Sequence, residues 1–384
     1  MSSGQPGVRL VHLADYGGSY AGSFVTMIAA MLSLARERGW AAEAVFSPAA
    51  RERPWVADLE SRGLAVRFMP ARPPAKARES IGQLLAEDRR PTILHTHFTA
   101  FDIPAVKEAA RVEDAVVIWH NHMGPTRRPA TVARNVAKYL AFARRVDRML
   151  CVAPDAAAAA RHRGAPSSRL LFFPNGIDTS RFPLRSAERR AAARAELDVP
   201  DGTHLLLHFG WDWIRKGGDI LLASARELVD AGVPIRVVTV GAPQEAREMA
   251  DQLGLGEGVQ LLPPREDVLG LFAAADVFMA CSRSEANPFA VVESLCSGCP
   301  VVASRIPAHE WIAPGLAARR LTGLDPAEMT SAVRGLLERD GQVAAAETEQ
   351  ARHWVLENME LGAWAERLMA VYEAALPGHS PVRS

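Results

Sequence analysis

Hydrophobic and polar positions along the chain alternate between two kinds of segment. Short apolar runs, which are typical of buried strands, are separated by longer stretches with the apolar spacing of a helix. The first run lies at 8–13, a glycine turn follows it, and a helix is expected over 23–38. Further strands are expected at 42–46, 64–69, 92–96, 115–120 and 148–152. This order predicts a parallel, doubly wound sheet with helices on both faces.

The same order begins again after residue 200. Strands are expected at 205–209, 235–240, 259–262, 277–280 and 301–303. The turn signal Pro174-Asn175-Gly176 and an arginine- and alanine-rich stretch precede this second half, and they place a boundary near residue 185. The sequence therefore predicts two α/β domains, at 1–185 and 186–360. A helical segment at 361–384 is expected to pack back toward the N-terminal domain.

Composition narrows the function without identifying it. Of 384 residues, 48% are hydrophobic and 23% charged, which indicates a globular protein. Lys+Arg and Asp+Glu are equal at 44 each, so no net basic field favours binding of nucleic acid. The charge-free apolar stretch at 23–35 is too short to cross a bilayer, and no basic-then-apolar signal segment is seen. These features predict a cytoplasmic protein.

Cysteine spacing gives no sign of a structural zinc site. Cys296 and Cys299 form a single C-x-x-C, and neither a second such pair nor an H-x₃₋₅-H pair accompanies it. We expect the two cysteines to be packing residues, and we expect no bound metal.

Two loops between a strand and a helix are candidates for holding phosphate. In the first, Gly17 and Gly18 let backbone N–H groups approach an anion beside a helix N-terminus, although the spacing matches neither the dinucleotide fingerprint nor a P-loop. In the second, at 210–218, Arg215 and Lys216 precede a helix whose dipole disfavours cations, a conflict that a diphosphate would resolve. A plain turn and a solvated basic loop are the structural alternatives.

Two carboxylates eight positions apart, Glu285 and Glu293, flank a loop that opens a third helix. If this helix begins near Phe289, its free N–H groups lie just after Glu285. Paired carboxylates at such a place suit the hydroxyl groups of a sugar and a ribose. The alternative is that both are ordinary surface charges.

These segments together resemble the retaining glycosyltransferases of family 4, from about residue 8 to residue 375. The resemblance rests on Glu285-x₇-Glu293, on G-x-x-x-x-R-K-G at 210–217, on Pro174-Asn175-Gly176-Ile177-Asp178, on Gly17-Gly18 and on the stretch 271–277. It implies a GT-B fold, in which two Rossmann-like domains face each other across a cleft. The C-terminal domain would hold a nucleotide sugar and the N-terminal domain the acceptor.

The resemblance also implies roles for single residues. Lys216 and Arg215 would bind the donor diphosphate, Glu293 the ribose hydroxyls and Glu285 the hydroxyls of the donor sugar. His120 matches a family histidine near that sugar, and His122 is the alternative residue for this role. The structural alternative is that His120 only caps the end of a strand. We expect Glu285, Lys216 and His120 to be the catalytic positions, and the remaining donor-binding positions to be Gly17, Gly18, Asn287, Phe289 and Ala290.

One position departs from the family pattern. The family commonly has arginine after the glycine where this chain has Trp211. Either Arg215 replaces that arginine at the diphosphate, or the site depends on Lys216 and backbone donors.

The activity expected from the resemblance is transfer of a sugar from a GDP- or UDP-sugar, with retention and without a metal or other cofactor. The partners are the nucleotide sugar and a soluble small-molecule acceptor. A basic stretch with interleaved aromatics leaves two alternatives open, an anionic or lipid acceptor and a weak contact with a membrane surface. Its cations are Arg127, Arg128, Arg134, Lys138, Arg144, Arg145 and Arg148.

Other classes are less well supported by the residues. A protein that binds a nucleotide sugar without transferring it has only Trp211 in its favour. A 2-epimerase conflicts with the combination of the Asn-Gly-Ile-Asp turn and the paired glutamates. A phosphorylase lacks a lysine placed for pyridoxal, and a hydride-transfer enzyme lacks the G-x-G-x-x-G fingerprint.

Overall fold

A computed structural model describes residues 7–19, 21–126, 128–265 and 267–377, and it divides the chain into two compact units. Unit 1 comprises the chain up to Gly176 together with the segment from Leu361 onward, and unit 2 is Ile177–Glu360. The chain passes from unit 1 to unit 2 at Gly176, whereas the sequence placed a boundary near residue 185. The arginine- and alanine-rich stretch thus lies in unit 2, where part of it forms a helix, α7 (Ala187–Glu196).

Unit 1 is built on a parallel sheet of seven strands in the order β3-β2-β1-β4-β5-β6-β7. Its strands are β1 (Arg9–Ala14), β2 (Ala41–Phe46), β3 (Ala65–Phe68), β4 (Thr92–His97), β5 (Ala115–Asn121), β6 (Arg148–Cys151) and β7 (Leu170–Phe172). Every residue of β1 and β4 is buried, which is why the central strands appear in the sequence as almost unbroken apolar runs.

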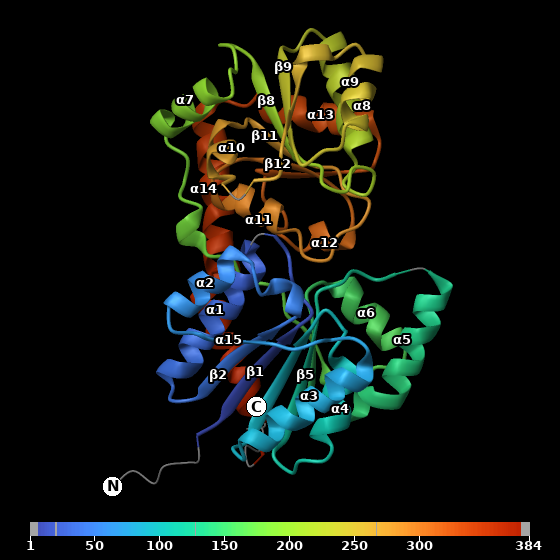
Figure 1. The fold of residues 1–384 in the computed structure, drawn as a ribbon. Helices are drawn as coiled ribbons and strands as arrows, with labels where there is room; N and C mark the ends of the chain where they lie inside the picture. Colours follow the sequence, from blue (N-terminus) through green and yellow to red (C-terminus); the bar gives the residue numbers. More distant parts are fainter. Residues whose placement is uncertain (1–6, 20, 127, 266, 378–384) are drawn as a thin grey trace. The chain divides into compact units, whose positions relative to one another are not determined.

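Helices cover both faces of the sheet (Figure 1), and all but the last of them connect two of its strands. They are α1 (Gly22–Glu37), α2 (Pro54–Ser61), α3 (Pro74–Glu87), α4 (Asp102–Ala109), α5 (Pro129–Phe142), α6 (Pro154–His162) and α15 (Leu361–Ala375). The last of them, α15, packs against α1, and its Tyr372 side chain is fully buried. The C-terminal segment therefore supplies part of the core of unit 1.

Unit 2 repeats this plan with six parallel strands in the order β10-β9-β8-β11-β12-β13. Its strands are β8 (His204–Phe209), β9 (Ile235–Val240), β10 (Val259–Leu262), β11 (Val277–Ala280), β12 (Val301–Ser304) and β13 (Arg319–Thr322). Its helices after α7 are α8 (Gly218–Asp230), α9 (Glu245–Gln252), α10 (Leu269–Ala274), α11 (Phe289–Cys296), α12 (Pro307–Glu310), α13 (Pro326–Leu337) and α14 (Gly341–Met359).

Alternate residues of one strand of unit 2 enter two different cores. Leu205 and Leu207 of β8 pack into one apolar cluster, and Leu206 packs into another on the opposite face. Both faces of this sheet are therefore covered, and the prediction of two doubly wound α/β domains is confirmed.

Two edge strands, β7 and β13, have no counterpart among the predicted strands. β7 has only three residues, all partly or fully exposed, and β13 begins with Arg319 and Arg320. Each strand lies at the edge of its sheet, where one side lacks a neighbour and an apolar run is not required. None of the described helices is both long enough and apolar enough to cross a bilayer.

Candidate active site

The loop that carries Lys216 follows the carboxyl end of β8 and leads into α8. Gly217 ends this loop with a φ of 72°, in the left-handed region, and a Cβ at this position would lie 2.0 Å from the Cys281 carbonyl oxygen. The N–H of Lys216 donates to the carbonyl of Asp212 at 2.8 Å, which closes the turn. The glycine thus lets the loop lie directly against the end of β11. This contact fixes the position of the backbone from which the Lys216 side chain extends.

Glu285 lies after β11, and its side chain meets Lys216. The Lys216 Nζ donates to Glu285 Oε1 at 2.6 Å, and the Ser282 hydroxyl donates to the same oxygen at 2.7 Å. The second oxygen, Oε2, lies 3.4 Å from Nη1 of Arg215. The side chains of Lys216 and Glu285 are only 15% and 10% exposed. The structure therefore brings together three of the predicted site residues, Lys216, Glu285 and Arg215, in one charged and largely buried cluster.

The electrostatics of this cluster favour the charged form of Glu285. Burial by itself raises the pKa of the Glu285 carboxyl, but the Lys216 ammonium, hydrogen bonds from Lys216 and Ser282, and the Arg215 guanidinium hold that pKa below its usual value. In this structure the Glu285 carboxylate lies beside Arg215 and Lys216, the two cations that precede α8. It thus occupies the place where a diphosphate would offset the unfavourable position of these cations at a helix N-terminus. A donor would therefore have to compete with Glu285 for Lys216.

The buried side chain of His208 supports the loop that carries Lys216. Burial lowers the pKa of His208 to about 4, so its ring is neutral at neutral pH. Its Nε2 lies 3.1 Å from the Lys216 carbonyl oxygen and its Nδ1 3.0 Å from the Thr239 hydroxyl. The neutral ring fits both partners when Nε2–H donates to the carbonyl and Nδ1 accepts from the hydroxyl.

Trp211, at the position where the family commonly has arginine, packs beside the cations of Arg215 and Lys216. The Arg215 guanidinium lies 4.7 Å and the Lys216 ammonium 5.4 Å from the centre of the Trp211 ring. Arg215 is also held by the Asp212 carboxylate at 2.6 Å and by the Ser284 carbonyl at 2.9 Å. Because Trp211 is 65% exposed, the ring forms an open aromatic wall beside the cations.

The helix that follows Glu285 begins where the sequence predicts. α11 starts at Phe289 with Pro288 as its N-cap, and Glu293 lies one turn inside it with 9% exposure. Phe289 and Ala290 therefore belong to the first turn, whose N–H groups have no partner within the helix. Asn287 precedes that turn, and its carbonyl accepts from the Phe289 N–H at 3.0 Å.

The Gly17-Gly18 turn of unit 1 follows β1 and is held by its carbonyl oxygens. Arg53 Nε donates to the Gly17 carbonyl at 3.1 Å, and Trp55 Nε1 donates to the Gly18 carbonyl at 3.0 Å. A Cβ on Gly18 would lie 2.7 Å from the Tyr16 hydroxyl, so a side chain there would displace the tyrosine. With its carbonyls used in this way, the turn is rigidly placed at the end of β1, before α1.

His120 lies at the end of β5 and is 2% exposed. Burial, with His122 beside it, lowers the pKa of His120 well below its usual value. The rings of His120 and His122 are stacked, with their centroids 4.0 Å apart, and His122 is the more exposed of the two. His120 is therefore a neutral side chain, suited to exchanging a hydrogen bond rather than supplying charge.

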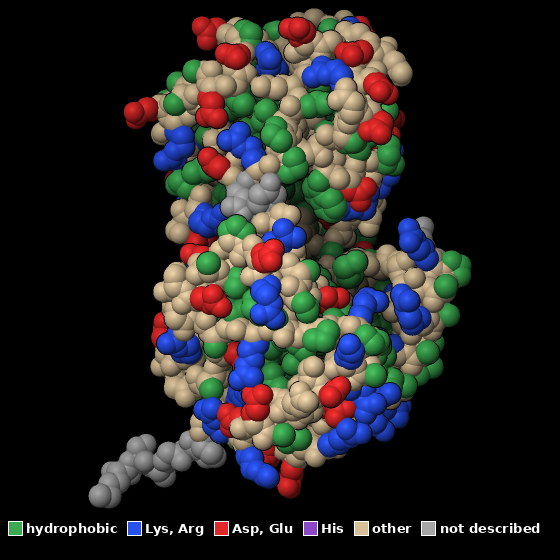
Figure 2. Space-filling model, in the orientation of Figure 1, with side chains coloured by type: hydrophobic (Ala, Val, Ile, Leu, Met, Phe, Trp, Pro, Cys, Tyr) green, Lys and Arg blue, Asp and Glu red, His purple; other side chains and the backbone are tan. Residues whose placement is uncertain are grey.

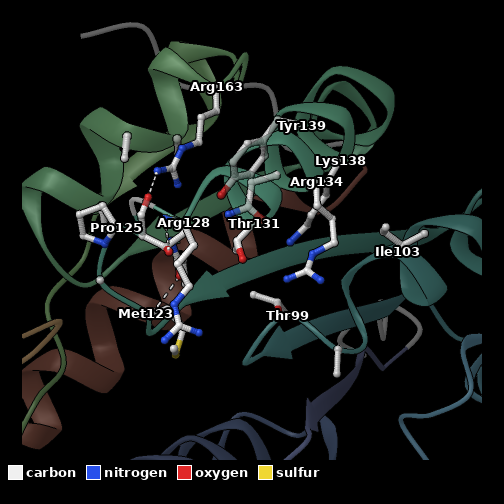
Figure 3. A pocket seen from close by; sticks show the side chains of 18 of the residues that line it. Thr99, Ile103, Met123, Pro125, Arg128, Thr131, Arg134, Lys138, Tyr139 and Arg163 are labelled. Carbon is white, nitrogen blue, oxygen red and sulfur yellow. Dashed lines mark hydrogen bonds between the residues drawn. The ribbon is translucent and has the colours of Figure 1, made fainter.

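A cavity of about 790 Å³ in unit 1 collects part of the basic stretch. Lys and Arg side chains gather over the part of unit 1 that carries α4 and α5 (Figure 2). Of the cations that line the cavity, two come from α5, one from the segment just before it and one from the position just after α6 (Figure 3). A fifth comes from the loop after β3. The five cations are Arg72, Arg128, Arg134, Lys138 and Arg163. Arg144, Arg145 and Arg148 do not line it, and Arg127 lies outside the described residues.

Several residues of these sites were not found from the sequence. Ser282 and Asp212 complete the charged cluster, and His208 supports it, but each is a common residue type with no fixed spacing to the glutamates. Arg72 joins the cavity from a loop more than fifty positions before Arg128. The sheet order places the ends of β8 and β11 side by side, and this relates Ser282 to Asp212. Arg72 and Arg128 follow β3 and β5, which are not neighbours, so no strand pairing relates them.

Replacement of Gly217 by alanine tests the close approach between the loop before α8 and the end of β11. We expect Gly217→Ala to lower the free energy of unfolding by more than about 2 kcal/mol, because the new Cβ meets the Cys281 carbonyl and the backbone keeps a positive φ. Gly232→Ala is the matched control, since its φ is 75° and no atom lies within 4 Å of the new Cβ. Urea unfolding should show a loss of about 1 kcal/mol in the control. Equal losses in the two variants would contradict the close contact.

Two family models match the chain, one in each half. A model described as Glycosyltransferase Family 4 matches residues 24–181, and one described as Glycosyl transferases group 1 matches residues 203–339. The first match begins within α1, and the second begins just before β8 and includes Lys216, Glu285 and Glu293.

Curated relatives and solved structures agree with these matches. The chain is 25% identical to D-inositol 3-phosphate glycosyltransferase 1 of Catenulispora acidiphila, over 95% of this chain and 94% of that protein. It is 26% identical to D-inositol 3-phosphate glycosyltransferase of Geodermatophilus obscurus, over 94% and 89%. HepE of Anabaena in complex with UDP and glucose superimposes with a TM-score of 0.80 at 17% identity, over 95% of this chain and 99% of that one. Sucrose-phosphate synthase of Thermosynechococcus elongatus gives 0.77 at 18%, over 95% and 98%. The predicted GT-B fold is confirmed.

Proposed function

Because the chain belongs to glycosyltransferase family 4 and is a glycosyltransferase that uses a nucleotide sugar, we propose that it transfers the sugar with retention of anomeric configuration and without a metal at the diphosphate. The observation that carries this proposal is the Lys216–Glu285 pair beside Arg215. It offers cations for a diphosphate and a carboxylate for sugar hydroxyls within one cluster. The nucleoside is uridine or guanosine.

In the proposed reaction the fixed cations replace a metal ion. As the bond between the anomeric carbon and the diphosphate oxygen breaks, negative charge develops on the leaving group, where Lys216 and Arg215 are already in place. The acceptor oxygen bonds to the anomeric carbon on the face that the diphosphate leaves, and its proton passes to the leaving phosphate. Glu285 binds sugar hydroxyls in this scheme and is not a nucleophile. The donor-binding roles of Gly17, Gly18, His120, Asn287, Phe289, Ala290 and Glu293 stay predictions.

The stereochemical result tests this mechanism. Purified protein is screened with UDP- and GDP-sugars and candidate acceptors, and release of nucleotide identifies an active pair. The anomeric configuration of the product is then read by NMR coupling constants, with and without a chelator. We expect the configuration of the donor to be kept and the rate to be unchanged by the chelator. An inverted product would contradict the proposed mechanism, and a rate that needs an added metal would contradict the role of the cations.

For the acceptor we propose a small molecule that carries a phosphate or another anionic group. The cavity of unit 1 is large enough for a small molecule, and the described residues that line it include five cations and no Asp or Glu. Among the described residues, neither Arg128 nor Arg134 has an ion-pair partner, whereas Lys138 pairs with Asp102. The relatives named D-inositol 3-phosphate glycosyltransferase make an inositol phosphate a sensible first probe.

Binding of D-inositol 3-phosphate and of unphosphorylated inositol tests this acceptor class. We expect the phosphate to bind at least about tenfold more tightly, because a charged hydrogen bond contributes about 1.5–3 kcal/mol. Arg134→Ala should remove most of this preference, and Arg144→Ala, whose side chain does not line the cavity, should keep it. Calorimetry measures both. If the phosphate has no advantage while anionic liposomes sediment the protein at low salt, the lipid or membrane alternative is favoured instead.

A further inference from the structure

Five histidines of unit 1 lie together at the carboxyl ends of three adjacent strands. His12 of β1 is the register partner of His95 in β4, and His97 of β4 is the partner of His120 in β5. Side chains alternate between the two faces of a strand, so His95 and His97 share a face, and so do register partners on neighbouring strands. His122 follows His120 by two positions, just after β5 ends. The register therefore directs all these rings to one side of the sheet.

The rings contact one another and a tyrosine of the C-terminal helix. His12 Nδ1 lies 2.9 Å from His97 Nε2, and His97 Nδ1 lies 2.9 Å from His122 Nε2. The Tyr372 hydroxyl lies 2.5 Å from His95 Nδ1 and 3.5 Å from His12 Nε2. His12, His95 and His97 are each at most 2% exposed. Imidazole nitrogens are thus packed here into a space that water barely reaches.

Three ring nitrogens in this cluster have no hydrogen-bond partner within the described residues. They are His95 Nε2 and both nitrogens of His120, and all three are buried. A buried polar atom left without a partner costs about 1–3 kcal/mol, so such atoms call for a bound ion or water. Burial also favours the neutral imidazole, which is the form that binds a metal.

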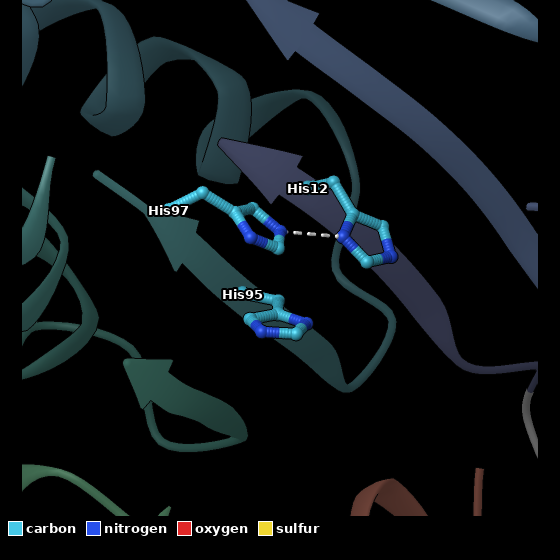
Figure 4. A group of neighbouring side chains, drawn as sticks. All are labelled: His12, His95 and His97. Carbon is cyan, nitrogen blue, oxygen red and sulfur yellow. Dashed lines mark hydrogen bonds between the residues drawn. The ribbon is translucent and has the colours of Figure 1, made fainter. Parts of the chain in front are cut away.

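We propose that His12, His95 and His97 bind a divalent transition-metal ion of the zinc class. One ring nitrogen from each residue lies within 4.8 Å of one from each of the others. The three rings come from two adjacent strands and point toward a common space (Figure 4). Nitrogen ligands of tetrahedral zinc are about 3.3 Å apart, so small rotations of the three rings are needed.

The chemistry of the ligands selects the kind of ion. Imidazole nitrogen suits Zn²⁺, Co²⁺, Ni²⁺ and Cu²⁺, whereas Mg²⁺ and Ca²⁺ prefer oxygen. His97, His120 and His122 form a second possible triad, but it shares His97 and includes the half-buried His122. The first triad is favoured because all three of its residues are buried, whereas His122 of the second triad is partly exposed.

A bound ion would connect distant parts of unit 1. The ion would link β1 and β4, and two of its ligands, His95 and His12, also contact the Tyr372 hydroxyl of α15 through a ring nitrogen. Binding to the folded state alone raises stability by an amount that grows with ion concentration. This role is structural and independent of the proposed transfer reaction, in which none of the three ligands takes part.

The test uses the full chain purified without a histidine tag and stripped of metal by a chelator. Co²⁺ is then titrated into wild-type protein, His95→Gln and His162→Gln, the last being an exposed histidine of unit 1. We expect wild type and the control to bind one Co²⁺ per chain, with visible absorption bands typical of nitrogen ligands. Binding in His95→Gln should be at least about 100-fold weaker. Zn²⁺ should raise the melting temperature of wild type and the control only.

A second measurement keeps the proposal testable if His95→Gln does not fold. X-ray absorption of wild-type protein loaded with one equivalent of Zn²⁺ should show the multiple-scattering pattern of about three imidazoles. A spectrum without imidazole scattering, or a titration that shows no saturable binding to wild type, overturns the proposal. So does undiminished binding by a folded His95→Gln protein.

Discussion

Lys216→Ala should slow nucleotide release from the preferred nucleotide sugar by about 30- to 1000-fold. This range corresponds to about 2–4 kcal/mol, the loss measured in other enzymes when one fixed donor to a developing charge is removed. The ammonium is 15% exposed and only 2.6 Å from Glu285, so it is already held in place before the donor arrives. The ammonium is therefore positioned beside the site, and the diphosphate replaces Glu285 as its partner when the donor binds.

Initial rates with saturating donor measure this effect. Lys76→Ala is the matched control, because Lys76 is exposed on α3 of the other unit and the change in side chain is identical. Circular dichroism and urea unfolding check that both variants fold. Turnover of Lys216→Ala within threefold of wild type would mean that this lysine is not at the diphosphate.

Glu285→Gln should separate binding of the nucleotide from use of the sugar. The substitution keeps the shape of the side chain and removes the charge that pairs with Lys216 in the absence of donor. UDP or GDP alone should then bind as tightly as to wild type or more tightly, because the diphosphate no longer competes with a carboxylate. Turnover of the nucleotide sugar should fall by about 10- to 150-fold, as a charged hydrogen bond to a sugar hydroxyl is lost.

Two further variants give this prediction its controls. Glu245→Gln changes an exposed carboxylate on α9 and should alter neither affinity nor turnover. Glu285→Ala should lose turnover as well, and it should also lower stability, because it leaves the Lys216 ammonium half-buried without its partner. If Glu285→Gln weakens UDP and GDP as much as it lowers turnover, the carboxylate serves the nucleotide and not the sugar.

The fold could be predicted because most strands of a doubly wound sheet carry a strong sequence signal. Leu205, Leu206 and Leu207 are all buried although they point to both faces, so the run is apolar throughout. The edge strands lack this constraint, and Arg319 and Arg320 conceal β13 in the sequence. Arg319 instead satisfies its charge locally, by donating to the carbonyls of His309 and Ala313.

The sequence predicted only those parts of the candidate site that local motifs determine. The start of α11 and the loop before α8 are local features, and both lie where the motifs indicate. The partners of Glu285 are not local: the pair with Lys216 spans 69 positions. The sequence assigned both residues to one ligand but gave no reason to expect a direct contact between them.

The histidine cluster shows the same limit more clearly. Zinc sites recognisable in sequence bring their ligands together through short, fixed spacings. Here the ligands come from strands β1 and β4, and their contact depends on which strands are neighbours. The H-x-H pairs at 95–97 and 120–122 were a usable signal, because a spacing of two on a strand puts both rings on one face.

Calorimetric titration with UDP and with GDP tests most directly the claim that the loop at Lys216 in unit 2 binds the diphosphate of the donor. Wild type and Lys76→Ala should bind at least one of the two with the same Kd. The Kd of Lys216→Ala for that nucleotide should be about 10- to 150-fold higher, the range expected for loss of one charged hydrogen bond. A Kd for Lys216→Ala within twofold of wild type would contradict the claim.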